Sequence, residues 1–301
     1  MRRMMKKKVI APVLAAIFII SFYALFHEME RKGCFSQNLS ISKKWDMSDR
    51  PNLKVLILGD TGTGDQNQKQ VADASAATCK ELGCDLVLYL GDNFYPEGVK
   101  GIEDRQFSER FEDIYPQQIP FCSILGNHDV KGDWKAEIEY TNRSQRWYMP
   151  ETNYDFSAGP VHFYAVNTNC SPLPFLKLKM DSSKEWNIVF GHHPFASSGN
   201  HADMDFISRF FMDRLDFDLY ISGHQHLLEH LQKDGKNYII SGGGGGPLQS
   251  KEKEDSSYSR FVARKHGYVW AEFKRESAQF IFYDQDGKKI YDFSRKKEGV
   301  K

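Results

Sequence analysis

The chain has 301 residues, of which 41% are hydrophobic and 14% aromatic, so it is long enough to bury one sizeable core, and it shows no internal repeat. Its formal net charge is zero, but the first 26 residues hold five basic residues and no acidic one, which leaves 35 basic and 40 acidic residues after them. A main domain with a net charge of −5 gives no reason to expect a nucleic-acid partner.

The N-terminus is basic and then apolar. An uncharged run from Val9 to Phe26, 18 residues long, follows the basic residues and lies at the lower end of the length that spans a bilayer. Because no small-residue cleavage site follows in a good context, we expect residues 1–26 to be an uncleaved signal anchor rather than a cleaved signal peptide. The basic flank predicts an exported main domain, either membrane-anchored or, after cleavage, secreted. A buried core helix is the remaining alternative and suits the flanking charges badly.

The next segment, residues 27–50, is polar and without periodicity, so we expect a tether, followed by one folded domain over residues 51–295. The chain has five cysteines, an odd number for an exported protein, and none has zinc-finger spacing. The spacing permits a disulfide between Cys79 and Cys84 but does not establish the pairing.

In the first half of this domain, short apolar runs alternate with segments of helical periodicity, which is the pattern of βαβ units. Strands are expected at 53–58, 86–90 and 121–125, with helices at about 66–82 and 103–113. The second half predicts strands near 161–166, 187–190, 219–222, 226–231 and 237–241, a helix near 203–214, and a final hairpin of Tyr268–Phe273 with Gln279–Tyr283. The elements expected in both halves fit an α/β fold in which two mixed sheets pack face to face with helices outside them. This is a four-layer α/β/β/α sandwich.

Polar side chains of the kinds that bind metals follow five of the predicted strands, directly after a glycine. The segments are Gly59-Asp60, Gly91-Asp92-Asn93-Phe94-Tyr95, Gly126-Asn127-His128-Asp129, Gly191-His192-His193-Pro194 and Gly223-His224-Gln225-His226. Each alone has an ordinary structural explanation, such as a helix cap, a turn or a surface pair. Their joint occurrence at strand ends predicts that they converge on one metal centre.

The ligand types suit two cations. A carboxylate can give one oxygen to each of two metals and offset their repulsion, and Asp92 is the expected bridge, while Asp60 would bind one metal alone. Asn127 supplies a neutral oxygen and the histidines supply imidazole nitrogens. The i, i+2 spacing of His224 and His226 places both side chains on one side of an extended segment, where they can reach neighbouring metals.

In these five segments and their order, residues 51–290 resemble the calcineurin-like metallophosphoesterase superfamily, and within it the purple acid phosphatases of the compact, tartrate-resistant type. Two residues carry the finer resemblance: Gly62 stands where most of the superfamily has a histidine, and Tyr95 can supply the missing ligand. A phenolate suits a hard ferric ion. The resemblance implies the metallophosphoesterase fold for the sandwich.

The resemblance also implies the roles of individual residues. The ferric site would be Asp60, Asp92, Tyr95 and His226, and the second site, holding Fe2+, Zn2+ or Mn2+, would be Asp92, Asn127, His192 and His224. His128 and His201 would contact the phosphate and the leaving group, whereas His193 has no ligand role in the pattern.

The function that follows is an acid phosphatase that hydrolyses phosphate monoesters by attack of a metal-bound hydroxide, with activity shifted to acidic pH. Two alternatives stay open: a phosphodiesterase or nucleotide hydrolase on the same site, and a non-enzymatic, membrane-tethered metal-binding protein. The sequence leaves the physiological substrate and the oligomeric state undetermined.

Two further features have expected structural roles. The glycine run Gly242–Gly246 is not followed by the Lys-Ser of a phosphate-binding loop, so a tight backbone passage beside the metals is expected instead. The aromatic residues Trp134, Trp147 and Tyr148 fit the mouth of the cleft and the core equally well.

Overall fold

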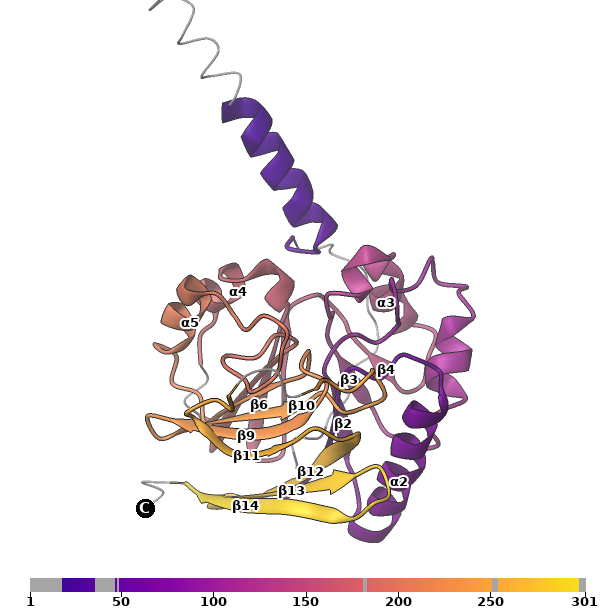
Figure 1. The fold of residues 1–301 in the computed structure, drawn as a ribbon, viewed down its shortest axis with the longest axis vertical. Helices are drawn as coiled ribbons and strands as arrows, with labels where there is room; N and C mark the ends of the chain where they lie inside the picture. The colour runs from indigo at the N-terminus through magenta and orange to yellow at the C-terminus, as the bar shows by residue number, and fades with distance from the viewer. Residues whose placement is uncertain (1–17, 36–46, 48, 181–182, 251–253, 298–301) are drawn as a thin grey trace, which may run out of the picture.

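The computed structural model describes residues 18–35, 47, 49–180, 183–250 and 254–297. Two β-sheets of seven strands each form the middle of the domain, and helices lie outside them (Figure 1). The expected sandwich of two mixed sheets is therefore confirmed.

The first sheet joins the beginning of the domain to its end. Its strands β1, β2, β3 and β4 run parallel to one another, and β12 pairs antiparallel with the other side of β1. The order across the sheet is β14 (Lys289–Lys296), β13 (Ser277–Asp284), β12 (Gly267–Phe273), β1 (Leu53–Leu58), β2 (Leu86–Tyr89), β3 (Phe121–Ser123) and β4 (Trp147–Tyr148).

The second sheet is built from the middle of the chain. Its strands β6, β7, β8 and β10 are mutually parallel, and its edges are antiparallel. The order is β11 (Ser259–Ala263), β9 (Leu228–Lys233), β10 (Lys236–Ser241), β8 (Leu219–Ser222), β7 (Trp186–Gly191), β6 (Val161–Val166) and β5 (Tyr154–Ala158).

The helices begin at recognisable caps. Asp65 accepts a hydrogen bond from the Gln68 amide at the start of α2 (Gln66–Leu82), and Asp205 caps α5 (Phe206–Met212) in the same way. Because Asp205 fixes its start, α5 is shorter than the helix expected near 203–214. The helix expected over 103–113 is reduced to a π-helical segment at Ser108–Glu112. Two further short helices are α3 (Trp134–Tyr140) and α4 (Leu173–Lys177).

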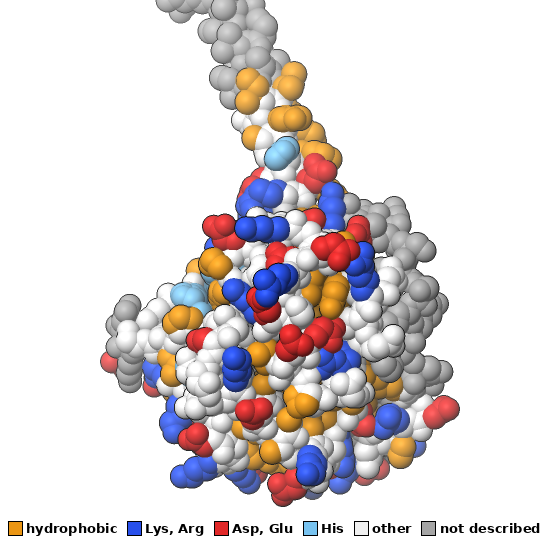
Figure 2. All heavy atoms as spheres, turned by 90° about the vertical axis from the view of Figure 1, so that its right-hand side faces the viewer, with side chains coloured by type: hydrophobic (Ala, Val, Ile, Leu, Met, Phe, Trp, Pro, Cys, Tyr) orange, Lys and Arg blue, Asp and Glu red, His pale blue; other side chains and the backbone are white. Residues whose placement is uncertain are grey.

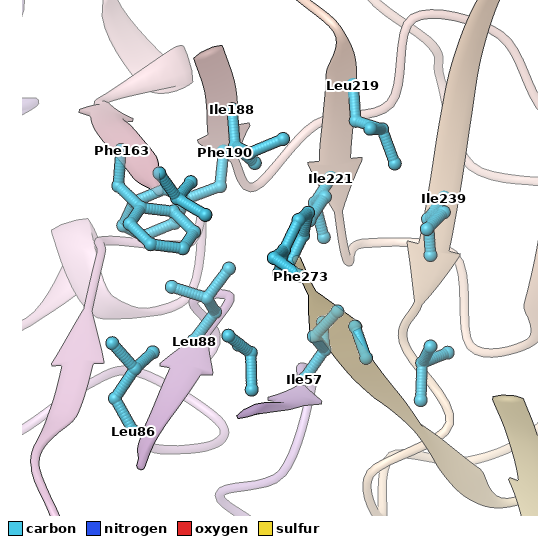
Figure 3. Close-up of a cluster of buried hydrophobic side chains, with 14 of the residues drawn as sticks. Ile57, Leu86, Leu88, Phe163, Ile188, Phe190, Leu219, Ile221, Ile239 and Phe273 are labelled. Carbon is cyan, nitrogen blue, oxygen red and sulfur yellow. The ribbon is translucent and has the colours of Figure 1, made fainter. Parts of the chain in front are cut away.

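The main core lies between the two sheets. Ile57 and Leu88 of the first sheet face Phe163, Ile188 and Ile221 of the second (Figure 3). Alternate strand residues such as Leu56 and Leu58 point the other way, into a separate core under the helices. Both faces of the parallel strands are therefore buried, which explains why they read as continuous apolar runs.

Two of the three aromatic residues that could line the cleft or the core, Trp134 and Trp147, belong to this second core. Trp147 is completely buried, Trp134 is 4% exposed, and both pack in the cluster under the helices. Tyr148 is partly buried against the core between the sheets. Both tryptophans are therefore core residues, whereas Tyr148 is partly exposed.

The segment before the domain contains a helix and is linked to the domain by a disulfide. Residues 18–31 form a helix that projects from one end of the domain (Figure 1), so the helix continues past the expected boundary at residue 26. Cys34 forms a disulfide with Cys170, 136 residues away, and the Asn167 side-chain amide donates to the carbonyls of residues 32 and 33. A second disulfide confirms the Cys79–Cys84 pairing.

Within the described residues, no helix is both long and apolar enough to cross a membrane. Residues 1–17 of the expected anchor, and residues 36–46 and 48 of the expected tether, lie outside the described part of the chain.

Candidate metal centre

The five predicted segments meet at one edge of the sandwich. β1, β2 and β3 are parallel neighbours in the first sheet, and β7 and β8 are parallel neighbours in the second. The carboxyl ends of parallel strands lie at the same edge of a sheet, so each segment leaves its strand toward the same region.

Three of the predicted ligands have unusual backbone conformations. Asp60, Asp92 and His224 have φ angles of 57°, 51° and 67°, in the left-handed region that side chains disfavour. Among the other described non-glycine residues only Asp234, in the turn between β9 and β10, shares this region. Such strained residues cluster at functional sites because the surrounding fold holds them there.

One set of donor atoms comes from three loops. The Tyr95 hydroxyl oxygen lies 3.2 Å from Oδ1 of Asp60 and 3.0 Å from Nε2 of His226, and the last two atoms are 3.5 Å apart. Nδ1 of His226 donates to the Pro247 carbonyl at 2.7 Å, which turns Nε2 toward the cluster. Ligands about 2.0–2.2 Å from a shared cation are separated by distances of this order.

A second set of donor atoms surrounds His192. Its Nε2 lies 3.1 Å from Oδ1 of Asn127, 3.2 Å from Nδ1 of His224 and 3.4 Å from Oδ1 of Asp92. Its Nδ1 donates to the Leu90 carbonyl at 2.8 Å, so the lone pair of Nε2 faces the other donors. This arrangement is typical of a metal-binding histidine oriented by a backbone carbonyl.

The two sets adjoin each other at buried carboxylates. Ligand atoms of Asp60, Asp92 and His192 all lie within 4.8 Å of one another, and all three residues are buried. In the described part of the chain, the ion-pair partners of the two aspartates are histidines. Buried carboxylates of this kind are costly without a compensating cation, so the donors fit metal ions.

The pKa values of His192, His226 and Tyr95 are all raised, which shows that the site favours positive charge. Burial lowers the pKa of His192, but Asp92 and Asp60 more than offset this, so the net shift is upward. His226 responds in the same way: burial lowers its pKa, and contact with Asp60 outweighs this and raises the pKa to about 8. Burial, followed by the charges of Asp60 and Asp92, raises the pKa of the Tyr95 hydroxyl. A cation bound among these groups would replace the protons that they otherwise attract.

The two non-ligand histidines flank the cluster on different sides. The His128 ring lies 4.6 Å from the Tyr95 ring, and its Nε2 is 3.9 Å from Oδ2 of Asp92. The ring of His201 lies 5.1 Å from that of His224 and 5.3 Å from that of His226. All nine residues predicted as ligands or catalytic groups are therefore brought into one region.

His193, which has no ligand role in the family pattern, makes hydrogen bonds to Thr168 and Tyr220. Its Nδ1 lies 2.8 Å from the Thr168 hydroxyl, and its carbonyl accepts a hydrogen bond from Tyr220. Burial, followed by the charge of His192, lowers the pKa of His193 to about 3, which keeps the ring neutral.

The glycine run passes directly beside the donor atoms. A Cβ on Gly242 would lie 2.7 Å from Oδ2 of Asp60, and one on Gly246 would lie 2.8 Å from the His226 ring. Only glycine lets the backbone approach this closely. The expected tight passage beside the site is confirmed.

Asp129, to which the sequence pattern gave no role, connects two of the loops that carry predicted ligands. Its carboxylate accepts hydrogen bonds from the amides of Asn93 at 2.9 Å, Phe94 at 3.1 Å and Gly126 at 2.7 Å. It thereby joins the loop of Asp92 to the loop of Asn127. The only signal in the sequence was the carboxylate two residues after a predicted ligand.

Gln225, which was not predicted from the sequence as part of the site, makes two hydrogen bonds to the backbone of His201. Its Oε1 accepts from the His201 amide at 3.1 Å, and its Nε2 donates to the His201 carbonyl at 2.8 Å. Nδ1 of His201 in turn donates to the His224 carbonyl at 2.8 Å. Gln225 is therefore a positioning residue for His201.

If His201 has the catalytic role predicted for it, Gln225→Leu should lower kcat by about 10- to 100-fold, because a small displacement of a group that acts on the substrate is that costly. KM should change little, and Gln232→Leu, an exposed position on β9, should leave both constants unchanged. An unaltered kcat in the Gln225→Leu protein would show that Gln225 is not needed to position His201.

Oxygen and imidazole donors at the ends of parallel strands, in a sandwich of two mixed sheets, define a metal-dependent phosphoesterase. The profile of the family described as calcineurin-like phosphoesterase matches residues 53–228, more than half of the chain. The chain belongs to this family.

Its relatives by sequence include phosphatases from plants and mammals. The chain is 29% identical to purple acid phosphatase 7 of Arabidopsis thaliana over 303 residues, covering 86% of this chain and 90% of the relative. It is 28% identical to the human tartrate-resistant acid phosphatase type 5 over 298 residues, covering 80% and 90%.

Solved structures share the fold. A Plasmodium protein, GAP50, described as the anchor in the inner membrane complex, aligns with a TM-score of 0.70 at 22% identity, covering 83% of this chain and 90% of the other. A purple acid phosphatase from yellow lupin, Lupinus luteus, aligns with a TM-score of 0.60 at 15% identity, covering 81% of this chain and 53% of the other.

Proposed function

We propose that the protein is a binuclear acid phosphatase that hydrolyses phosphate monoesters. The observation that carries this proposal is the pair of adjoining donor sets, one around Nε2 of His226 and one around Nε2 of His192, with the Asp92 carboxylate beside the second. The acid phosphatases among its relatives, aligned over 80% or more of the chain, support the choice of reaction.

The proposed ligand sets follow the two groups of donors. Asp60, Asp92, Tyr95 and His226 would hold a ferric ion, and Asp92, Asn127, His192 and His224 would hold Fe2+, Zn2+ or Mn2+. When bound, two such cations supply positive charge for the phosphate oxygens and lower the pKa of water that they contact. Elemental analysis of the purified chain tests the ferric assignment, for which iron must be present.

The protein's own groups would bind the ester and handle its leaving group. Asp60 and Asp92 hold the geometry of the site through hydrogen bonds from the amides of His224 and His128, at 2.8 Å each. His128 and His201 flank the donor cluster, so their imidazoles would offset charge on the phosphate or give a proton to the departing alkoxide. Gln225 would keep His201 in place for that step.

A comparison of substrates tests the proposed reaction. We expect turnover of an aryl phosphate monoester to exceed that of the matching diester by at least about tenfold, with kcat highest below neutral pH because metal-acidified water remains deprotonated there. Faster diester turnover would instead support the phosphodiesterase or nucleotide hydrolase alternative. No turnover of either ester by the folded, metal-loaded chain would leave the non-enzymatic alternative.

We also propose that the domain over residues 51–295 is exported and attached to a membrane by the N-terminal segment. Support comes from the apolar side chains of residues 18–26, which stand in solvent above a belt of charged side chains (Figure 2). The two disulfides fit an oxidising compartment. Flotation of the full chain with lipid vesicles tests the attachment.

A further inference from the structure

A short helix, α5, exposes apolar side chains on its outer face. Phe206, Ile207 and Phe210 of α5 are 76%, 55% and 42% exposed. The inner face of the same helix is also apolar, since Met212 is buried and Phe211 packs against the core. A helix at the surface of a water-soluble domain normally keeps its outer face polar, so a helix that is apolar on both faces calls for a partner.

A second exposed apolar side chain extends this face. Leu176 of the neighbouring helix α4 is 51% exposed, and α4 lies against α5. We call Leu176, Phe206, Ile207 and Phe210 the α4–α5 face. All four side chains remain 42–76% exposed, although the Arg214 guanidinium lies over the Phe210 ring.

The α4–α5 face lies at the end of the domain to which the apolar N-terminal helix is joined. Cys170, which is disulfide-bonded to Cys34 at the base of that helix, stands three residues before the start of α4. Figure 1 shows α4 and α5 at the end of the domain from which residues 18–31 leave. The large hydrophobic side chains of residues 18–26 are 47–72% exposed, so the N-terminal helix and the α4–α5 face both present apolar groups to solvent.

The charges around the face suit a lipid surface. Lys177 and Lys179 are exposed beside Leu176, and the Arg214 guanidinium stacks on the Phe210 ring at 3.3 Å. Of the acids next to α5 in the chain, Asp205 caps the helix and Asp213 pairs with Lys233 at 3.2 Å, whereas Asp216 is exposed. Aromatic and aliphatic groups with basic neighbours are typical of helices that lie in the membrane interface.

We propose that the α4–α5 face rests on the lipid bilayer that receives the apolar N-terminal helix. Two apolar surfaces at the same end of the domain, with a disulfide between the segments that precede the domain and α4, would enter one planar interface together. A second copy of the chain fits less well, because a stable dimer interface takes about 20–30 residues from each partner and this face has four side chains. The inference rests on the proposed membrane attachment and is independent of the phosphatase activity.

Depth-dependent quenching tests this docking in the full chain. An environment-sensitive fluorophore is placed on Ile207→Cys, and the control is the same label on Lys288→Cys, exposed in the turn before β14 at the far end of the domain (Figure 1). Cys122, the one free cysteine, is buried, so the label reports the chosen position. The proteins are mixed with vesicles of phosphatidylcholine and phosphatidylserine that carry a quencher at a shallow depth.

We expect the label at Ile207 to be quenched and the label at Lys288 to stay unquenched. Adding Phe206→Ser and Phe210→Ser should abolish the quenching while the protein still floats with the vesicles through its N-terminal helix. An unquenched Ile207 label on vesicle-bound protein, or failure to bind vesicles at all, would overturn the proposal. So would a spectral shift that grows with protein concentration in the absence of lipid, since this would indicate a second copy on the face.

Discussion

Asp92→Asn should reduce phosphate monoester hydrolysis by about a thousandfold or more. The substitution keeps the size of the side chain and its tolerance of the left-handed backbone, with φ of 51°, but removes the charge that the proposed cations share. Compensation of charge by metals is worth several kcal/mol in the transition state, and each 1.36 kcal/mol is a factor of ten. The measurement is kcat with an aryl phosphate, together with the metal content per chain.

Asp234→Asn provides the matched control for that experiment. Asp234 shares the left-handed backbone, with φ of 50°, but stands exposed in the turn between β9 and β10. Its variant should keep full activity and metal content. If Asp92→Asn retained a tenth of the activity with normal metal content, Asp92 would be a structural carboxylate and the binuclear proposal would fail.

His201→Ala should lower kcat by about 100-fold or more, because proton transfer by a positioned side chain contributes about 10²–10⁴-fold. The loss should be greater for an alkyl phosphate than for a nitrophenyl phosphate, because a poor leaving group depends more on a proton donor. His128→Ala, on the other side of the cluster, should show which of the two histidines protonates the leaving group. The measurement is kcat for both substrates across acidic pH.

His162→Ala controls for the loss of a histidine elsewhere. His162 of β6 pairs with Asp155 at 2.9 Å on the outside of the second sheet and should be dispensable for catalysis. If His201→Ala slowed both esters equally, the residue would bind or orient the phosphate without donating a proton. If neither ester were slowed, the residue would have no part in the reaction.

The strands that carry the site were predictable because their environment is simple. β1 and β8 have the predicted bounds, since a strand buried on both faces reads as an unbroken apolar run that ends at a glycine. The polar residues that follow them, Asp60 after β1 and His224 after β8, could be proposed as ligands because each comes directly after the glycine that ends such a run. By contrast, β4 has only two residues and owes its existence to pairing with β3, which no local pattern encodes.

Long-range partners were beyond the sequence for a physical reason. Five cysteines allow many pairings, and spacing alone could support only the short Cys79–Cys84 loop, so the Cys34–Cys170 disulfide was missed. The role of Gln225 was hidden in the same way, because it depends on a contact with His201, 24 residues earlier in the chain. Both the disulfide and the Gln225–His201 hydrogen bonds depend on the folded geometry rather than on a sequence motif.

The Cys34–Cys170 disulfide also determines what a protease can release. A single cut anywhere between the two cysteines leaves both fragments covalently joined, so the cut protein would run as one band without reductant and as two with it. A cut before Cys34 instead frees the apolar helix, while Cys34 stays with the rest of the chain. If the proposed membrane attachment holds, a single cut would therefore release the domain only on the N-terminal side of this bond.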